Sequence, residues 1–398
     1  MAERAEIPFA GSTVIGLDAS HFAAIQRTVR VLSALAHAPS YQASLAPSAC
    51  EVTRHEPGNF GVFMGYDFHV TPAGPRLIEV NTNAGGALLN GLHTASLCDP
   101  EKLACLCCDL LSVNDLERDL VATFRAEYEA ATGRSGAELA RIAIVDDAPA
   151  QQFLAPEFEL FRALFAGAGI EARVADTREL ARAPEGGLAL GSFRPQLVYL
   201  RDTDFALASE RASALRGAYL AREVVVTPSP REHFLLADKR RLACFSSREQ
   251  LTALGVAEDD ARFLTEVIPE TRLLAELDAE RVWRERASWV FKPAAAFGSR
   301  AVYRGDKISR KKFAEIAAQA GYVAQRHAPP GLVHVETSDG PREMKFDVRA
   351  YAYRDRVLLL GARVYEGQVT NLRSPGGGFS AICVVRPLGD FGDVHTCR

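Results

Sequence analysis

Residues 64–86 read MGYDFHVTPAGPRLIEVNTNAGG. Two short apolar runs are separated by TPAG, whose proline and glycine are typical of a turn. We therefore predict a β-hairpin. With the turn centred on Ala73, antiparallel pairing places Asp67 opposite Glu79. The two-residue period of a strand puts Asn81 on the same face as Glu79.

The hairpin predicts a metal site, because Asp67, Glu79 and Asn81 would bring three oxygen donors to one patch. Mg²⁺ binds a few carboxylate or amide oxygens and completes its octahedron with phosphates and water. The alternative is a solvated polar face of an ordinary hairpin. Asp67 alone would favour that alternative, whereas the three residues followed by TNAGG favour the metal.

A second motif, VFKPAAAFGSRAV (290–302), places Lys292 at the end of an apolar strand before a loop of small residues. Small residues such as Gly298 and Ser299 let backbone N–H groups approach phosphate oxygens, and a lysine adds a point charge. The P-loop pattern is absent from the sequence. Lys239, in LLADKRR, is a candidate second phosphate lysine, although alone it would be a surface charge.

Arginines and glycines mark the C-terminal part. Arg349 in FDVRAYAY and Arg363 in LGARVYEG lie on predicted apolar strands, where a guanidinium needs an anionic partner from protein or ligand. Asn371 follows eight residues later, and Arg373 precedes the three glycines 376–378. Consecutive glycines cost conformational entropy, which favours a backbone that approaches a ligand closely. A flexible surface loop is the alternative.

The organisation of the chain changes at about residue 139. Strand patterns in ARIAIVDD, IEARVAD, PQLVYLRDTD and REVVVTPSP alternate with the helical pattern QQFLAPEFELFRALFAGAG. Such alternation predicts a small parallel α/β unit. We expect three parts: 1–138 with the hairpin and helices, 139–228 as a Rossmann-like domain, and 229–398 with the lysine and glycine motifs. Residues 233–255 are expected to be helical.

Composition narrows the function. The 398 residues carry a net charge of −4, with 48% hydrophobic and 24% charged residues. That length predicts two or three subdomains, and the absence of a basic excess argues against nucleic acid or an anionic membrane as partner. No apolar run approaches the roughly 20 residues of a membrane span, and the N-terminus lacks a signal-peptide pattern, so we expect a cytoplasmic protein. The cysteine cluster 98–108 lacks zinc spacing and favours a buried helix over a metal or redox site.

The order of these motifs resembles eukaryotic glutathione synthetase and, more distantly, the synthetase domain of glutathionylspermidine synthase. LIEVNTNAGG is similar to the metal-binding strand of that family, FKPAAAFGSRAV to its phosphate loop, and SPGGGF to its closing loop. The resemblance implies an α/β (α+β) chain with an ATP-grasp fold in circularly permuted order and an inserted Rossmann-like substrate domain. The permuted order follows because the Glu-x-Asn strand precedes the substrate domain.

The resemblance also implies roles for individual residues. Asp67, Glu79 and Asn81 would hold Mg²⁺, and Arg201 in LVYLRDTDF would touch the substrate, with Arg373 as a second carboxylate anchor. Arg349, Arg363 and Lys292 would stabilise charge during catalysis. ATP would be held by Lys239, Lys292, Gly298, Ser299, Gln325 in VAQR, Asn371 and Gly377.

The implied activity is that of an ATP-dependent carboxylate–amine ligase, which joins an amino acid or small peptide to an amine through an acyl phosphate. ATP and Mg²⁺ are the implied cofactors, and a homodimer is a further expectation. Two departures from the family matter: Gly65 stands where the family has an arginine, and Ala294–Ala296 offer no metal-binding glutamate. The alternatives are an ATP-grasp phosphotransferase and a non-catalytic module that binds nucleotide or peptide.

Overall fold

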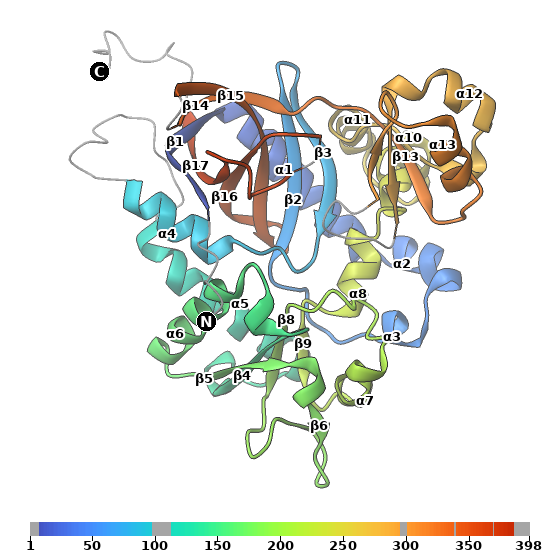
Figure 1. The fold of residues 1–398 in the computed structure, drawn as a ribbon. Coiled ribbons are helices and arrows are strands. Elements are labelled where there is room, and N and C mark those ends of the chain that lie inside the picture. Colours follow the sequence, from blue (N-terminus) through green and yellow to red (C-terminus); the bar gives the residue numbers. More distant parts are fainter. Residues whose placement is uncertain (1–7, 98–112, 295–300, 338–339, 369, 386–398) are drawn as a thin grey trace.

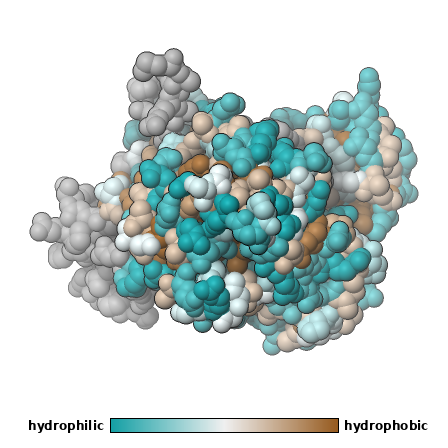
Figure 2. Space-filling model, turned by 90° about the horizontal axis from the view of Figure 1, so that it is seen from below, coloured by the Kyte–Doolittle hydropathy of each residue, from teal (hydrophilic) through white to brown (hydrophobic). Residues whose placement is uncertain are grey.

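The computed structural model describes residues 8–97, 113–294, 301–337, 340–368 and 370–385 (Figure 1). Three β-sheets dominate it, and Figure 1 shows the parallel sheet below the two others. Among the described residues, no helix has the length and apolar character needed to cross a bilayer. The face seen from below is mainly hydrophilic, with apolar residues scattered across it (Figure 2).

The largest sheet has seven strands in the order β1-β17-β16-β15-β2-β3, with β14 paired to β15. Its strands are β1 (Phe9–Asp18), β2 (Met64–Thr71), β3 (Gly74–Asn81), β14 (Gly331–Thr337), β15 (Gly340–Tyr353), β16 (Arg356–Tyr365) and β17 (Gly378–Val385). All neighbours are antiparallel except β1 and β17. The sequence patterns did not predict β1 or β14. The N-terminal part of the chain also contains the helices α1 (Ala19–Ala36), α2 (Pro39–Leu45), α3 (Glu51–Arg54), α4 (Ala87–Leu97) and α5 (Val113–Thr132).

The hairpin prediction is confirmed, because β2 and β3 pair and Asp67 lies opposite Glu79. The turn is centred between Pro72 and Ala73, half a residue before the predicted centre at Ala73. Thr71 pairs with Gly74 across a two-residue turn, and the register shifts between Asp67 and Phe68. That β-bulge inserts one extra residue on β3, which restores the predicted pairing.

The parallel α/β unit is also confirmed. Its four strands, β4 (Arg141–Asp146), β5 (Glu171–Asp176), β8 (Leu197–Leu200) and β9 (Val225–Thr227), run parallel in the order β5-β4-β8-β9. Helices α6 (Ala155–Gly167) and α7 (Ser213–Leu220) belong to this unit, as does a ribbon of β6 (Ala181–Arg182) and β7 (Leu188–Ala189). The domain boundaries at residues 138 and 228 stay predictions.

The third sheet is antiparallel, in the order β10-β13-β11-β12. It consists of β10 (Thr271–Leu273), β11 (Trp289–Pro293), β12 (Tyr303–Arg304) and β13 (Tyr322–Arg326), accompanied by α12 (Ala279–Arg284) and α13 (Arg310–Ala317). These two helices contribute Val282, Phe313 and Ile316 to a separate small core.

The expected helix over 233–255 is broken into pieces, so that prediction was wrong. The pieces are α8 (Pro230–Glu232), a π-helical turn (His233–Ala237), α9 (Arg241–Phe245) and α10 (Arg248–Ala253), followed by α11 (Glu258–Val267). Asp238 leaves the helical range with ψ at 117°. Its side chain accepts a hydrogen bond from the Arg240 N–H at 3.0 Å, and such local bonds compete with helix. The break places Lys239 in a turn.

A buried carboxylate joins the first half of the chain to the parallel sheet. Glu127 on α5 is fully buried. Its oxygens accept hydrogen bonds from Asn59 Nδ2 (2.7 Å), Phe60 N (2.9 Å), Gly61 N (2.8 Å) and Thr227 Oγ1 (2.6 Å). Thr227 ends β9, so this one side chain ties α5, the loop before β2 and the parallel sheet together.

We expect Glu127→Gln to destabilise the protein by about 3 kcal/mol, because an amide NH₂ would face donors that need an acceptor. Urea unfolding measures the change in the free energy of unfolding. Glu129→Gln, at an exposed position of the same helix, is the matched control and should change it by less than about 0.5 kcal/mol. Equal effects of the two substitutions would contradict the role given to Glu127.

Candidate functional site

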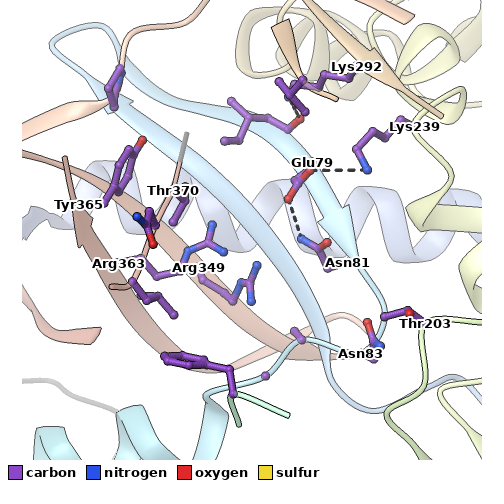
Figure 3. A pocket seen from close by; sticks show the side chains of 18 of the residues that line it. Glu79, Asn81, Asn83, Thr203, Lys239, Lys292, Arg349, Arg363, Tyr365 and Thr370 are labelled. Atoms are coloured by element: carbon purple, nitrogen blue, oxygen red, sulfur yellow. Dashed lines mark hydrogen bonds and ion pairs between the residues drawn. The ribbon is translucent and has the colours of Figure 1, made fainter. Parts of the chain in front are cut away.

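One cavity of about 860 Å³ lies where the three sheets meet. Its lining comes from β2, β3, β15 and β16 of the large sheet, from β11 and β13 of the small sheet, and from the carboxyl ends of β4 and β8. Ligand pockets measure about 300–1,000 Å³, so this cavity can hold a nucleotide-sized ligand. Figure 3 shows the side chains that converge on it.

Glu79 and Asn81 reach the cavity from β3, as predicted from the two-residue strand period. Asn81 Nδ2 lies 3.3 Å from Glu79 Oε1, and Lys239 Nζ lies 3.8 Å from Glu79 Oε2 (Figure 3). Lys239 reaches this position because the helix breaks at Asp238. The structure therefore brings one carboxylate, one amide and one ammonium group together at the edge of the large sheet.

Lys292 reaches the cavity from β11 of the small sheet, with 8% of its surface exposed. Its Nζ donates hydrogen bonds to the Ile78 carbonyl (2.9 Å) and to Gln325 Oε1 (2.8 Å). Burial, reinforced by the charge of Lys239, lowers the pKa of Lys292 to about 8, although Glu79 and Asp67 oppose the shift. Gln325, on β13, also donates to Thr271 Oγ1 at 3.2 Å. Both residues line the cavity.

Asp67 does not line the cavity wall with Glu79 and Asn81; it is fully buried behind it. Arg349 donates to both of its oxygens, with Nε at 2.6 Å and Nη2 at 2.7 Å, and Arg363 Nη2 lies 2.8 Å from Oδ2. Burial would raise the pKa of Asp67, but the two guanidinium groups lower it to about 2. The predicted metal ligand is thus already paired with two cations.

Arg363 has a second carboxylate partner. Asp347, also fully buried, accepts a hydrogen bond from Arg363 Nε at 2.7 Å. The strand register places Arg349 opposite Asp67 and Asp347 opposite Arg363. We call these four residues the charge square. Arg349 and Arg363 line the cavity and lie side by side in Figure 3. The charge square therefore holds two arginines at one end of the cavity.

Gly65 explains how Arg349 fits. A Cβ at Gly65 would lie 3.3 Å from Arg349 Nε, 3.4 Å from its Cδ and 2.5 Å from the Cβ of Ala84. Arg349 therefore crosses over the glycine.

Arg201 follows β8, at the carboxyl end of the parallel sheet. β4 and β8 are neighbours from which the chain continues in opposite directions, and open α/β sheets bind ligands at such a switch point. Arg201 is 6% exposed, lines the cavity and lies 4.0 Å from Glu157. Its Nε has no hydrogen-bond partner among the described residues. Asp146, at the end of β4, also lines the cavity, and burial raises its pKa to about 6.

The remaining predicted residues are less closely gathered. Asn371 and Arg373 line the cavity from the loop after β16. Gly377 does not line the cavity. A Cβ at this position would lie 2.6 Å from the Val364 carbonyl. A Cβ at Gly378 would lie 2.2 Å from the Pro8 carbonyl. At these glycines the close approach is to the protein's own backbone. Gly298, Ser299, Ala295, Ala296 and the cysteine cluster at 98–108 lie outside the described residues.

The donor set fits a magnesium ion that arrives with phosphates. Among the described residues, no group of three or more His, Cys, Asp or Glu side chains is placed to hold a metal. Glu79 and Asn81 supply two oxygen donors, and Lys239 and Lys292 supply charge for phosphates. Mg²⁺ is usually held by one or two carboxylates together with substrate phosphates and water, so this partial site suits it.

Sequence reasoning did not assign roles to Asp347, Thr370, Asp146 or Phe153. Thr370 donates a hydrogen bond of 2.6 Å to Oδ2 of Asp347, which lies within β15. Asp146 ends β4, Phe153 lies before α6, and both line the cavity. An aspartate in the apolar run FDVRAYAY was the available signal, since a buried charge needs a partner.

Comparison with known proteins gives the fold. No protein-family model and no curated protein sequence match the chain. A glutathione synthetase-like effector from Globodera pallida aligns with 93% of this chain and 88% of its own, at a TM-score of 0.57 and 12% identity. A γ-glutamylcysteine synthetase-like protein from Methylobacillus flagellatus aligns with 92% and 87%, at a TM-score of 0.50 and 11% identity. These two likenesses show that the chain has the fold of a glutathione synthetase-like protein, as the order of the motifs had predicted.

We expect the affinity for Mg-ATP to fall as the pH rises above about 8, by up to about tenfold per pH unit. Below its pKa Lys292 is charged and attracts phosphate; above it the charge is lost. Calorimetric titration at pH 7, 8 and 9 measures this. Lys292→Arg, which stays charged, should show no such decline over the same range. An unchanged affinity of the wild-type protein between pH 7 and 9 would contradict the assignment.

Proposed function

We propose that this protein is an ATP-dependent carboxylate–amine ligase that forms an amide bond between an amino acid or small peptide and an amine. The carboxylate would take the γ-phosphoryl group of ATP to give an acyl phosphate and ADP. The amine would then attack the acyl carbon, and phosphate would leave. No side-chain nucleophile is needed, so catalysis depends on positioning and on neutralising charge.

One observation carries the proposal: the residues that line one cavity include Lys239 and Lys292, Glu79 and Asn81, and the arginines 201, 349, 363 and 373. A ligase of this kind must bring a polyphosphate and a carboxylate together although both are negatively charged. Lysines at one wall and arginines at another would hold the two anions within one enclosure. A protein that only binds nucleotide has no need for the second set of cations.

Each group has a proposed role. Lys239 and Lys292 would bind phosphate oxygens, and Gln325 would border the adenine. Mg²⁺, when bound on Glu79 and Asn81, would neutralise phosphate charge. Arg349 and Arg363 would stabilise the negative charge that develops on the transferred group. In this proposal Asp67 holds the two arginines directly. It would act on the magnesium only through Asn81, whose Nδ2 lies 3.0 Å from Asp67 Oδ2.

Arg201 and Arg373 are proposed to anchor the substrate's carboxylate at the end of the parallel sheet. The circularly permuted order is part of the proposal too. The strand with Glu79 precedes the parallel sheet in the chain, and β11 with Lys292 follows it.

The second candidate function is a module that binds Mg-ATP without turning it over. The observation favouring it is the charge square, because Asp67 is bound by two arginines and the described metal donors number only two. A phosphotransferase, which would release a phosphorylated product, is the third candidate.

ADP release with product mass spectrometry separates the three. The full chain is mixed with Mg-ATP and a panel of amino acids, short peptides and amines. A ligase gives ADP together with a new amide mass. A phosphorylated acceptor without an amide would favour the phosphotransferase. Tight Mg-ATP binding without ADP release would leave either a substrate outside the panel or the binding module.

We expect Glu79→Gln to lower ADP formation by more than about 100-fold, because the carboxylate on the metal is lost while the fold is kept. Glu343→Gln, an exposed carboxylate on β15, is the control and should retain full activity. Circular dichroism checks that both variants fold. A folded Glu79→Gln variant with normal turnover would rule out the metal assignment.

A further inference from the structure

An apolar wall lines the cavity beside α6, and two of its residues, Phe153 and Leu154, lie outside the buried core clusters. Phe158, Phe161 and Phe165 form the buried face of α6, each at most 2% exposed. Phe153 and Leu154 come before the helix, are only half-buried, and belong to none of the buried core clusters. Both line the cavity. Their position suits contact with a ligand better than a role in folding.

This wall is continuous with the two arginines proposed to anchor a carboxylate. The Arg373 guanidinium carbon lies 5.2 Å from the centre of the Phe153 ring, and that of Arg201 lies 5.8 Å from the Phe158 ring. Leu154 and Arg201 also meet over Gly85: a Cβ there would lie 2.1 Å from Leu154 Cδ1 and 2.6 Å from Arg201 Nη2. A carboxylate bound at Arg201 would therefore have apolar side chains beside it.

Charge limits what else can bind there. Arg201 already faces Glu157 at 4.0 Å, and Asp146 and Asp147 line the same part of the cavity. Asp147 is paired with Arg178 at 2.7 Å. Glu157 and Asp146 therefore compensate much of the positive charge of Arg201. One carboxylate can be matched, whereas a second carboxylate on the same substrate would approach Asp146.

We propose that the substrate at this end of the cavity is a monocarboxylate with an apolar, preferably aromatic, side chain. Its carboxylate binds near Arg201, and its side chain packs on Phe153 and Leu154 beneath Arg373. The inference rests on the proposed ligase function, for which it names the class of substrate. Glutamate-like substrates are disfavoured.

Direct binding tests this class without turnover. Saturation-transfer NMR on the full chain with Mg-AMP-PNP compares L-phenylalanine, L-leucine, L-glutamate and glycine, which share the α-carboxylate and differ in the side chain. We expect phenylalanine and leucine to bind about tenfold more tightly than glutamate or glycine.

A matched pair of variants locates the preference. Phe153→Ala should weaken phenylalanine binding about tenfold and leave glycine binding unchanged. Leu332→Ala, at a 58% exposed apolar position on β14 outside the cavity, is the control and should bind all four as the wild type does. Circular dichroism establishes that both variants fold.

Three results would overturn the inference: glutamate binding as tightly as phenylalanine, an unchanged preference in Phe153→Ala, or no binding by any of the four. The ligase proposal stands or falls separately. ADP release with an acidic or polar carboxylate would leave that proposal intact while this inference fails, and absence of ADP release with the whole panel would count against the proposal itself.

Discussion

The structure depends on two buried carboxylates that each hold an arginine across neighbouring strands. Asp67 and Asp347 are both fully buried, and their partners are Arg349 and Arg363. Removing one member of such a set would leave an uncompensated buried charge, which costs about 3–5 kcal/mol. The square therefore fixes β2, β15 and β16 in register and at the same time delivers two guanidinium groups to the cavity.

The square also reaches the loop that borders the cavity. Asp347 accepts a hydrogen bond from Thr370, and the same loop carries Arg373 over Phe153 on the parallel-sheet side. Contacts from the large sheet thus continue to the carboxyl end of the parallel sheet. This arrangement gives a physical reason why the residues proposed to bind nucleotide and those proposed to bind substrate line one cavity, although they lie far apart in the sequence.

Local pattern predicted much of this. The hairpin, the pairing of Asp67 with Glu79, the parallel unit and the strand with Lys292 follow from turn chemistry and periodicity. The arginine partners of Asp67 could not be predicted in this way. Arg349 lies 282 positions away in the sequence, and only the strand order of the sheet brings it near Asp67. In the sequence, Gly65 indicated the loss of a positive charge relative to the resembling family. No sequence pattern shows that the Arg349 side chain crosses this glycine. The helix break at Asp238 was missed because a side-chain bond to the Arg240 N–H outweighed the apolar periodicity.

The central claim is that a carboxylate and ATP react within one cavity to give an acyl phosphate. The direct test uses ¹⁸O in the carboxylate of a substrate found by ADP release, with mass analysis of the inorganic phosphate. We expect one ¹⁸O atom in the phosphate for each amide formed, because a carboxylate oxygen leaves with the phosphate. Phosphate free of ¹⁸O, released alongside the amide, would rule out an acyl phosphate.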